Sequence, residues 1–189
     1  FEKTMQEIES QTNKIKTVPS VSNPDDGFDN DISDYVEENS ENAKTLTAIK
    51  DLNKDFTVES FVSGAKKAYE IILMAFENND LKALKPLLDK SVFESFKTVL
   101  DDRQKKQISI EASFIGMRDI RITNVYFDKK TNTAEITVAF KSEMSTVVKD
   151  KTGKVIEGDP NEIKKQKDIW TFSKKLADKK PIWFLKSTS

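Results

Sequence analysis

The spacing of apolar residues along this chain changes once, near Gln107, and this change constrains the fold more than any other feature of the sequence. Before Gln107, apolar residues recur every three or four positions, most regularly over residues 56–76, which predicts a helix of about five turns with one buried side. After Gln107, apolar and polar residues alternate over residues 108–140, a pattern typical of half-buried strands. Helices followed by antiparallel strands indicate an α+β fold, in which N-terminal helices pack on a curved antiparallel sheet.

Caps and turns divide these two parts into elements. Thr57 is expected to cap the long helix, Asp80 a short second helix and Ser91 a third. Gly64 lies inside the long helix, where glycine costs about 1 kcal/mol relative to alanine, so we expect another backbone or a bulky ring to pack closely against it. A hairpin turn is expected at Gly153. The expected strands cover residues 108–114, 120–127, 134–141, 168–173 and 181–185.

Charge is divided unevenly along the chain. Residues 1–55 carry 6 Lys/Arg against 13 Asp/Glu, whereas residues 56–189 carry 25 against 19, so an acidic arm precedes a basic domain. The arm has few large apolar residues, and we expect it to be a largely flexible linker. The alternative is that it folds back onto the domain or onto a partner through Phe28, Ile32, Tyr35 and Val36.

The sequence contains no cysteine and no histidine. This excludes Ser-His and Cys-His nucleophile pairs as well as thiolate and imidazole metal sites, and we expect neither a metal nor a cofactor. The carboxylates that suggest catalysis are Asp101, Asp102 and Asp168, and exposed charges at the ends of helices and strands explain them as well. An acid projecting into a closed apolar cavity beside Tyr69 or Tyr126 would instead indicate an enzyme, because desolvation would raise its pKa towards that of a general base.

Five strings of the sequence, in order, resemble the C-terminal domain of the mitochondrial inner-membrane import-motor tether, the Tim subunit of forty-four kilodaltons. They cover residues 61–76, 80–88, 153–160, 168–172 and 181–185. The resemblance to this Tim-forty-four-like family spans residues 56–188, and we expect a bacterial relative. It implies a cone similar to nuclear-transport-factor-two-like domains, with a hydrophobic pocket between sheet and helix.

The resemblance also implies a function. Members of the family lack known catalysis; the mitochondrial ones tether a chaperone to the preprotein translocase and associate with anionic lipid, and the bacterial ones follow a membrane anchor. We therefore expect a non-enzymatic, membrane-proximal interaction or scaffold domain, with a protein partner of translocase or chaperone type and anionic lipid as a second partner. The alternative is a small-molecule-binding or isomerase-like enzyme on the same fold. Nothing in residues 1–55 resembles the chaperone-recruiting half of the mitochondrial proteins.

The expected location is the bacterial inner membrane, through an anchor that preceded Phe1, because the chain does not begin with Met. No apolar run reaches the roughly 20 residues needed to span a bilayer, so the fragment itself is expected to be soluble. Nucleic acid is not an expected partner, because no aromatic residues interleave with Lys and Arg.

Two groups of residues are the candidate sites. The pocket group, expected to take an acyl chain or a peptide, consists of large aromatic residues: Phe61, Tyr69, Phe93, Phe96, Phe114, Phe140, Trp170, Phe172 and Trp183. The basic group, expected to face anionic lipid, consists of Lys66, Lys67, Arg103, Lys105, Lys106, Arg118 and Arg121, together with Lys164, Lys165 and Lys167. For each residue the alternative is an ordinary place in the core or on a solvated face.

Overall fold

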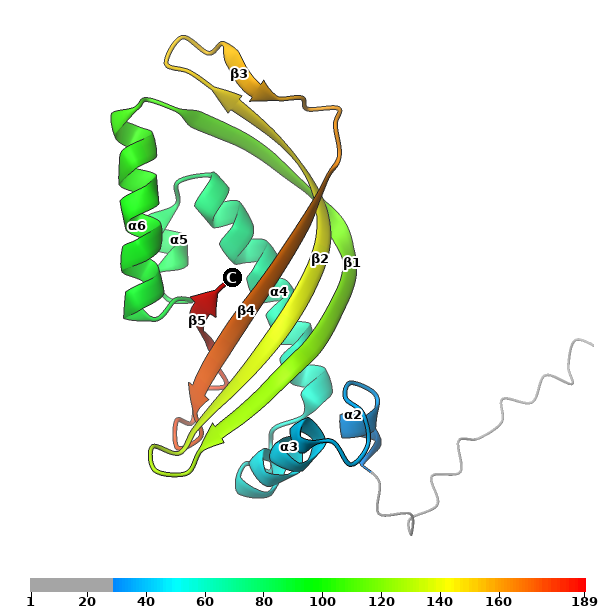
Figure 1. The fold of residues 1–189 in the computed structure, drawn as a ribbon. Coiled ribbons are helices and arrows are strands. Elements are labelled where there is room, and N and C mark those ends of the chain that lie inside the picture. Colours follow the sequence, from blue (N-terminus) through cyan, green and yellow to red (C-terminus); the bar gives the residue numbers. More distant parts are fainter. Residues whose placement is uncertain (1–28) are drawn as a thin grey trace, which may run out of the picture.

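The computed structural model describes residues 29–189, in which helices come first and strands follow (Figure 1). Expectations that concern residues 1–28, including contacts made by Phe28, lie outside the described residues. The helices are α2 (Asn30–Ser33), α3 (Glu41–Leu52), α4 (Val58–Glu77), α5 (Leu81–Leu84) and α6 (Lys90–Lys105). The strands are β1 (Ser109–Asp128), β2 (Thr133–Lys149), β3 (Val155–Gly158), β4 (Lys164–Lys175) and β5 (Phe184–Thr188).

The strands form one antiparallel sheet in the order β1-β2-β4-β5, with β3 paired to the end of β2. The sheet curves around α4, and α6 lies across its concave side (Figure 1). The predicted α+β fold, with N-terminal helices packed on a curved antiparallel sheet, is therefore confirmed.

β1 is one strand of 20 residues, whereas two shorter strands were expected on either side of Gly116. Its register against β2 shifts between Phe114 and Gly116, between Met117 and Asp119, and between Ile122 and Asn124. Such bulges insert an extra residue and bend a strand without ending its pairing, which explains how the alternation can break while the strand continues. The bulges contribute to the curvature of the sheet around α4.

α4 is the centre of the core. Thr57 caps its first turn by accepting a hydrogen bond from the Ser60 amide at 3.1 Å, as expected. The fully buried ring of Tyr69 stacks on Phe140, with ring centroids 4.3 Å apart, and lies 4.7 Å from the ring of Trp170. The helix is therefore held against β2 and β4 by aromatic contacts along its buried side.

Residues 29–55 pack on the domain, which differs from the expectation of a largely flexible arm. Leu46 and Ile49 of α3 are completely buried, and Ile32 of α2 is 5% exposed. Tyr35 and Val36 are partly buried against the same core, so this part of the chain matches the alternative in which the arm folds back. Because this segment is rich in polar residues on average, its composition does not reveal the narrow apolar stripe on its helices. About one apolar residue per turn lets a short helix pack on a core formed by the rest of the chain.

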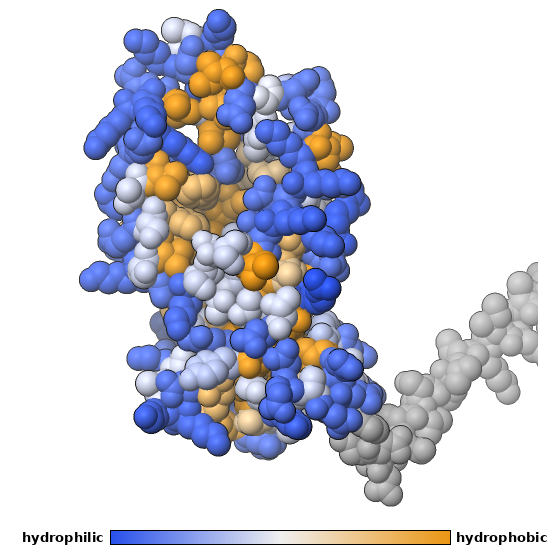
Figure 2. All heavy atoms as spheres, in the orientation of Figure 1, coloured by the Kyte–Doolittle hydropathy of each residue, from blue (hydrophilic) through white to orange (hydrophobic). Residues whose placement is uncertain are grey.

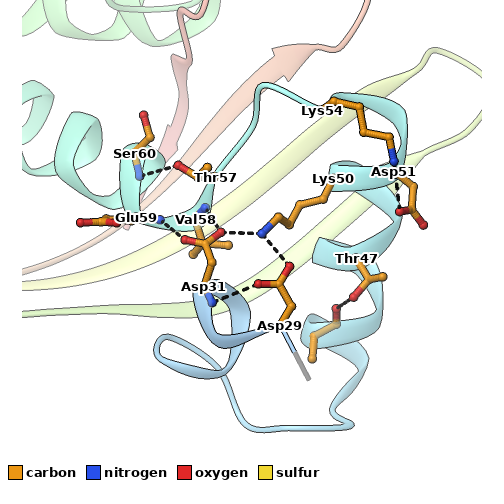
Figure 3. A network of polar contacts seen from close by, with 11 residues as sticks. Asp29, Asp31, Thr47, Lys50, Asp51, Lys54, Thr57, Val58, Glu59 and Ser60 are labelled. Atoms are coloured by element: carbon orange, nitrogen blue, oxygen red, sulfur yellow. Dashed lines mark hydrogen bonds and ion pairs between the residues drawn. The ribbon is translucent and has the colours of Figure 1, made fainter. Parts of the chain in front are cut away.

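A polar network attaches α2 and α3 to the start of α4 (Figure 3). The Asp31 carboxylate accepts hydrogen bonds from the backbone amides of Val58 at 2.7 Å and Glu59 at 3.0 Å. The Lys50 ammonium lies 2.8 Å from Asp31 and 2.6 Å from Asp29. Burial acts to raise the pKa of Asp31, but the hydrogen bonds from Lys50, Glu59 and Val58 outweigh it and hold the pKa below its ordinary value.

Candidate functional site

A pocket of about 660 Å³ opens beside the N-terminal half of α4. Its walls come from that half of the helix, from residues 53–57 that lead into it, and from the connection between β4 and β5. The Trp183 ring lies 4.9 Å from Phe61 and 5.9 Å from Phe56, so three aromatic rings form one side of the pocket. The connection runs past the start of α4, and this places Trp183 over the helix.

Phe61, Phe172 and Trp183 are the members of the predicted pocket group that line this pocket. The other members do not: Tyr69, Phe140 and Trp170 are buried against one another in the core, and Phe93, Phe96 and Phe114 are partly buried and pack on it. The Tyr69 ring of α4 packs on Phe114, Phe140 and Trp170 of the sheet, so these rings lie between the helix and the sheet. The pocket therefore lies at one end of α4 rather than between α4 and the middle of the sheet.

Gly64 has a different role from the one expected. Apart from the nearby backbone of the helix itself, no atom of residues 29–189 lies within 4 Å of the position that a Cβ would take, so no other backbone or ring of these residues packs against it. Gly64 instead lines the pocket. Its missing side chain leaves part of the pocket open.

The residues that could have indicated an enzyme are not arranged around the pocket. The Tyr69 hydroxyl donates to Asp168 Oδ2 at 2.7 Å and lies 2.9 Å from Ser142 Oγ. Burial raises the pKa of Tyr69 above its ordinary value, and the Asp168 carboxylate reinforces the effect. Neither Tyr69 nor Asp168 lines the pocket, and Tyr126 is 52% exposed.

The other two carboxylates form ordinary surface ion pairs on α6. Asp101 lies 2.7 Å from Lys97, and Asp102 lies 2.9 Å from Lys106, each one turn along the helix. Such pairs stabilise a helix weakly. Their geometry matches the expectation of exposed charges near a helix end.

Basic residues gather on the outer face of the sheet. β-Sheet register places Lys141 beside Lys167, and Arg121 lies in the neighbouring row on β1. Arg118 forms an ion pair on this face with Glu143, whose strand neighbour is Lys165. We call the exposed residues Arg118, Arg121, Lys141, Lys165 and Lys167 the basic face; Asp119 and Glu143 are the acidic residues among them.

Of the remaining residues of the predicted basic group, Lys164 lies on β4 opposite the buried Met144, and the others lie on α4 and at the C-terminal end of α6. The Arg103 guanidinium donates to the Phe76 carbonyl at 3.0 Å and lies over the Phe76 ring, so this residue has a structural role. Lys105 and Lys106 are exposed at the end of α6, and Lys66 and Lys67 are exposed on α4. Arg118, Arg121, Lys165 and Lys167 therefore lie on one surface, and the other residues of the predicted basic group do not belong to it.

One residue of the basic face and one of the pocket were not predicted from the sequence, although the alternation along their strands indicates both. Lys141 follows the inward-facing Phe140 in a strand, so alternation places it on the outer face. Lys174 is 5% exposed and lines the pocket, because it shares the inward face of β4 with Trp170 and Phe172. Alternation along β4 would have identified it as an inward-facing lysine.

Apolar side chains are also exposed near β3. Val155, Ile156 and Ile163 are 47%, 53% and 56% exposed. Figure 2 shows that hydrophilic residues cover most of the visible face, while apolar surface gathers near β3 and in the recess between α6 and the sheet. Within residues 29–189, no helix has the length and apolar character required to cross a membrane, and no cluster of three acidic side chains is arranged to hold a metal ion.

The fold and its surfaces define an α+β domain with a pocket at one end of its long helix and a basic outer sheet face. The chain belongs to the family of the Tim44-like domain, whose sequence model matches residues 42–189. The match begins within α3 and includes the whole sheet.

Two individual proteins are similar to this chain. The chain is 26% identical over 141 residues to the probable mitochondrial import inner membrane translocase subunit tin-44 of Caenorhabditis elegans; the match covers 74% of this chain and 33% of that protein. The chain therefore spans about a third of the length of this curated relative. Among solved structures, the intermembrane space region of the chloroplast protein ARC6 is 12% identical, with a TM-score of 0.47 over 68% of this chain and 94% of that one.

Proposed function

We propose that this chain is a non-enzymatic scaffold domain that works at a membrane as part of a protein-translocation apparatus. The observation that carries the proposal is membership of the Tim44-like family over residues 42–189. The worm relative is described as a probable subunit of the mitochondrial import inner membrane translocase, which supports a translocase component as the protein partner. A chaperone is the second proposed protein partner.

Anionic lipid is the second proposed ligand, and the basic face is its proposed site. Lysine and arginine residues close to an anionic bilayer each contribute about 1 kcal/mol of attraction. Arg121, Lys141 and Lys167 are exposed, and none of them forms an ion pair with another described residue. Their position on one side of a broad sheet would let several of them approach a membrane surface together.

The exposed apolar residues near β3 support a protein contact at that end of the molecule. Contiguous exposed apolar surface often marks an interaction site. Val155 and Ile156 project from a short strand at the margin of the sheet and are not needed to bury the core. A partner could therefore cover them while the basic face remains turned to the lipid.

Photo-crosslinking in membranes would test the partner directly. A photoreactive residue is placed at Ile156 in the chain with its native flanking sequence, and matched samples carry it at Lys82, an exposed position on α5. We expect crosslinks from Ile156 to a translocase subunit or to a chaperone of the import motor. Crosslinks to neither, with the protein present in the membrane fraction, would contradict the proposal.

A further inference from the structure

Lys174 is a buried cation without an anionic partner among the described residues. Its ammonium donates one hydrogen bond, to the Asp178 carbonyl oxygen at 3.1 Å, although a lysine has three N–H donors. No ion pair within residues 29–189 includes it. Burying a charge is costly unless the charge is paired, so the position of Lys174 suits an anion that comes from elsewhere.

The surroundings of Lys174 limit which anion fits. Phe61, Phe172 and Trp183 line the same pocket, and its volume of about 660 Å³ lies in the range of ligand-binding pockets. An inorganic anion would leave these apolar walls exposed to water. A carboxylate attached to an apolar group would use both the walls and the ammonium.

The backbone at the rim of the pocket favours a peptide over a fatty acid. Residues 179–183 run past the pocket, and within the described chain their backbone groups neither donate nor accept a backbone hydrogen bond. A peptide has amide and carbonyl groups that can pair with such a segment, and a fatty acid has none. Asp55 and Asp178 also line the pocket, and their negative charges favour a ligand with a single carboxylate over a polyanion.

We propose that this pocket binds the carboxyl terminus of a polypeptide whose last residue is apolar. Lys174 binds the terminal carboxylate, the aromatic wall accepts the last side chain, and the backbone of residues 179–183 pairs with the peptide. Capture of a C-terminal carboxylate and pairing of a peptide backbone with unpaired backbone groups are both established modes of peptide recognition. The proposal does not depend on the translocase role proposed above.

Calorimetric titration with a matched pair of peptides tests the proposal. The probe is an acetylated hexapeptide that ends in Ala-Leu with a free carboxylate, and its control is the same peptide with an amidated C-terminus. Because a hydrogen bond to a charged group is worth more than 1.4 kcal/mol, we expect the free acid to bind at least about tenfold more tightly. Intrinsic tryptophan fluorescence gives a second readout, because Trp183 lines the pocket and the other tryptophan, Trp170, is buried in the core.

Lys174→Met removes the charge and keeps most of the side-chain volume, and Lys175→Met is its matched control, because Lys175 is exposed and does not line this pocket. We expect Lys174→Met to bind the acid and the amide equally, and Lys175→Met to prefer the acid as the wild type does. Equal binding of the two peptides to the wild type would overturn the proposal, and this comparison does not require any variant to fold. Binding of octanoate as tight as that of the free-acid peptide would overturn the assignment to a polypeptide terminus.

Discussion

The hydroxyl of Tyr69 donates a hydrogen bond to the carboxylate of Asp168 over 2.7 Å, and this contact joins the middle of α4 to β4. The Tyr69 ring is completely buried, while its polar end reaches the less buried Asp168 and the Ser142 hydroxyl. Asp168, one of the carboxylates that the sequence offered as a catalytic candidate, therefore helps to fix the helix against the sheet.

Tyr69→Phe should destabilise the domain by about 1–3 kcal/mol, because Ser142 and Asp168 would each lose a hydrogen-bond partner while the aromatic packing stays. The free energy of unfolding in urea measures the loss. Tyr126→Phe is the control, since Tyr126 is 52% exposed and its change should leave stability nearly unaltered. Equal stability of wild type and Tyr69→Phe would show that the contact adds nothing.

Asp31→Ala should destabilise the domain by about 1–2 kcal/mol, because two amides at the start of α4 would lose their acceptor. Asp34→Ala serves as the control, since Asp34 is an exposed carboxylate in the same segment and forms no ion pair with a described residue. Urea unfolding compares the two variants. Similar losses in both would mean that the Asp31 network in Figure 3 does not hold residues 29–55 on the domain.

The contribution of Asp31 should also depend on pH. The pKa of its carboxyl is lower in the folded chain than in the unfolded one, so the unfolded chain binds a proton first as the pH falls. The stabilisation is therefore complete above the unfolded pKa of about 4 and is lost as the pH drops through the lower folded value. We expect the stability difference between wild type and Asp31→Asn to be larger at pH 7 than at pH 3; an unchanged or larger difference at pH 3 would reverse the predicted sign.

Two glycines should respond in opposite directions to alanine. Gly64→Ala should stabilise the protein by up to about 1 kcal/mol, since the helix gains propensity and the new Cβ meets no atom within 4 Å. Gly158→Ala should destabilise it by about 1–3 kcal/mol, because Gly158 has φ +84° and the new Cβ would lie 2.1 Å from the Thr146 carbonyl oxygen. Thermal unfolding of both variants checks the pair, and a loss of stability in Gly64→Ala would show that another group does pack there.

Elements with a long apolar pattern on one side could be predicted from the sequence. Elements whose burial depends on packing against other elements could not. The period of α4 and the alternation of residues 134–141 are set by burial on one side only, so the sequence shows them directly. In α3 the stripe of Ala43, Leu46 and Ile49 is narrow, and its burial depends on a core supplied by the rest of the chain.

The candidate site was predictable only in part. Trp170 and Trp183 look alike in the sequence, yet Trp170 is 4% exposed in the core and Trp183 lines the pocket. Which aromatic rings fill a space and which border it depends on how the whole sheet curves, and no local pattern contains that information. The basic face likewise needed the strand register, because Arg121, Lys141 and Lys167 come from three strands.

Binding to vesicles tests most directly the central claim that this domain works at a membrane. The chain is sedimented with vesicles of neutral lipid and with vesicles that contain anionic lipid. Three forms are compared: the wild type, a triple variant of the basic face (Arg121→Glu, Lys141→Glu and Lys167→Glu), and a control variant on α4 (Lys66→Glu and Lys67→Glu). We predict that the wild type and the control bind the anionic vesicles, and that the triple variant binds about a hundredfold more weakly or not at all, since each cation contributes about 1 kcal/mol. The assignment of the basic face to the membrane would be contradicted if the triple variant bound anionic vesicles as tightly as the wild type. It would also be contradicted if the α4 variant lost as much binding as the triple variant.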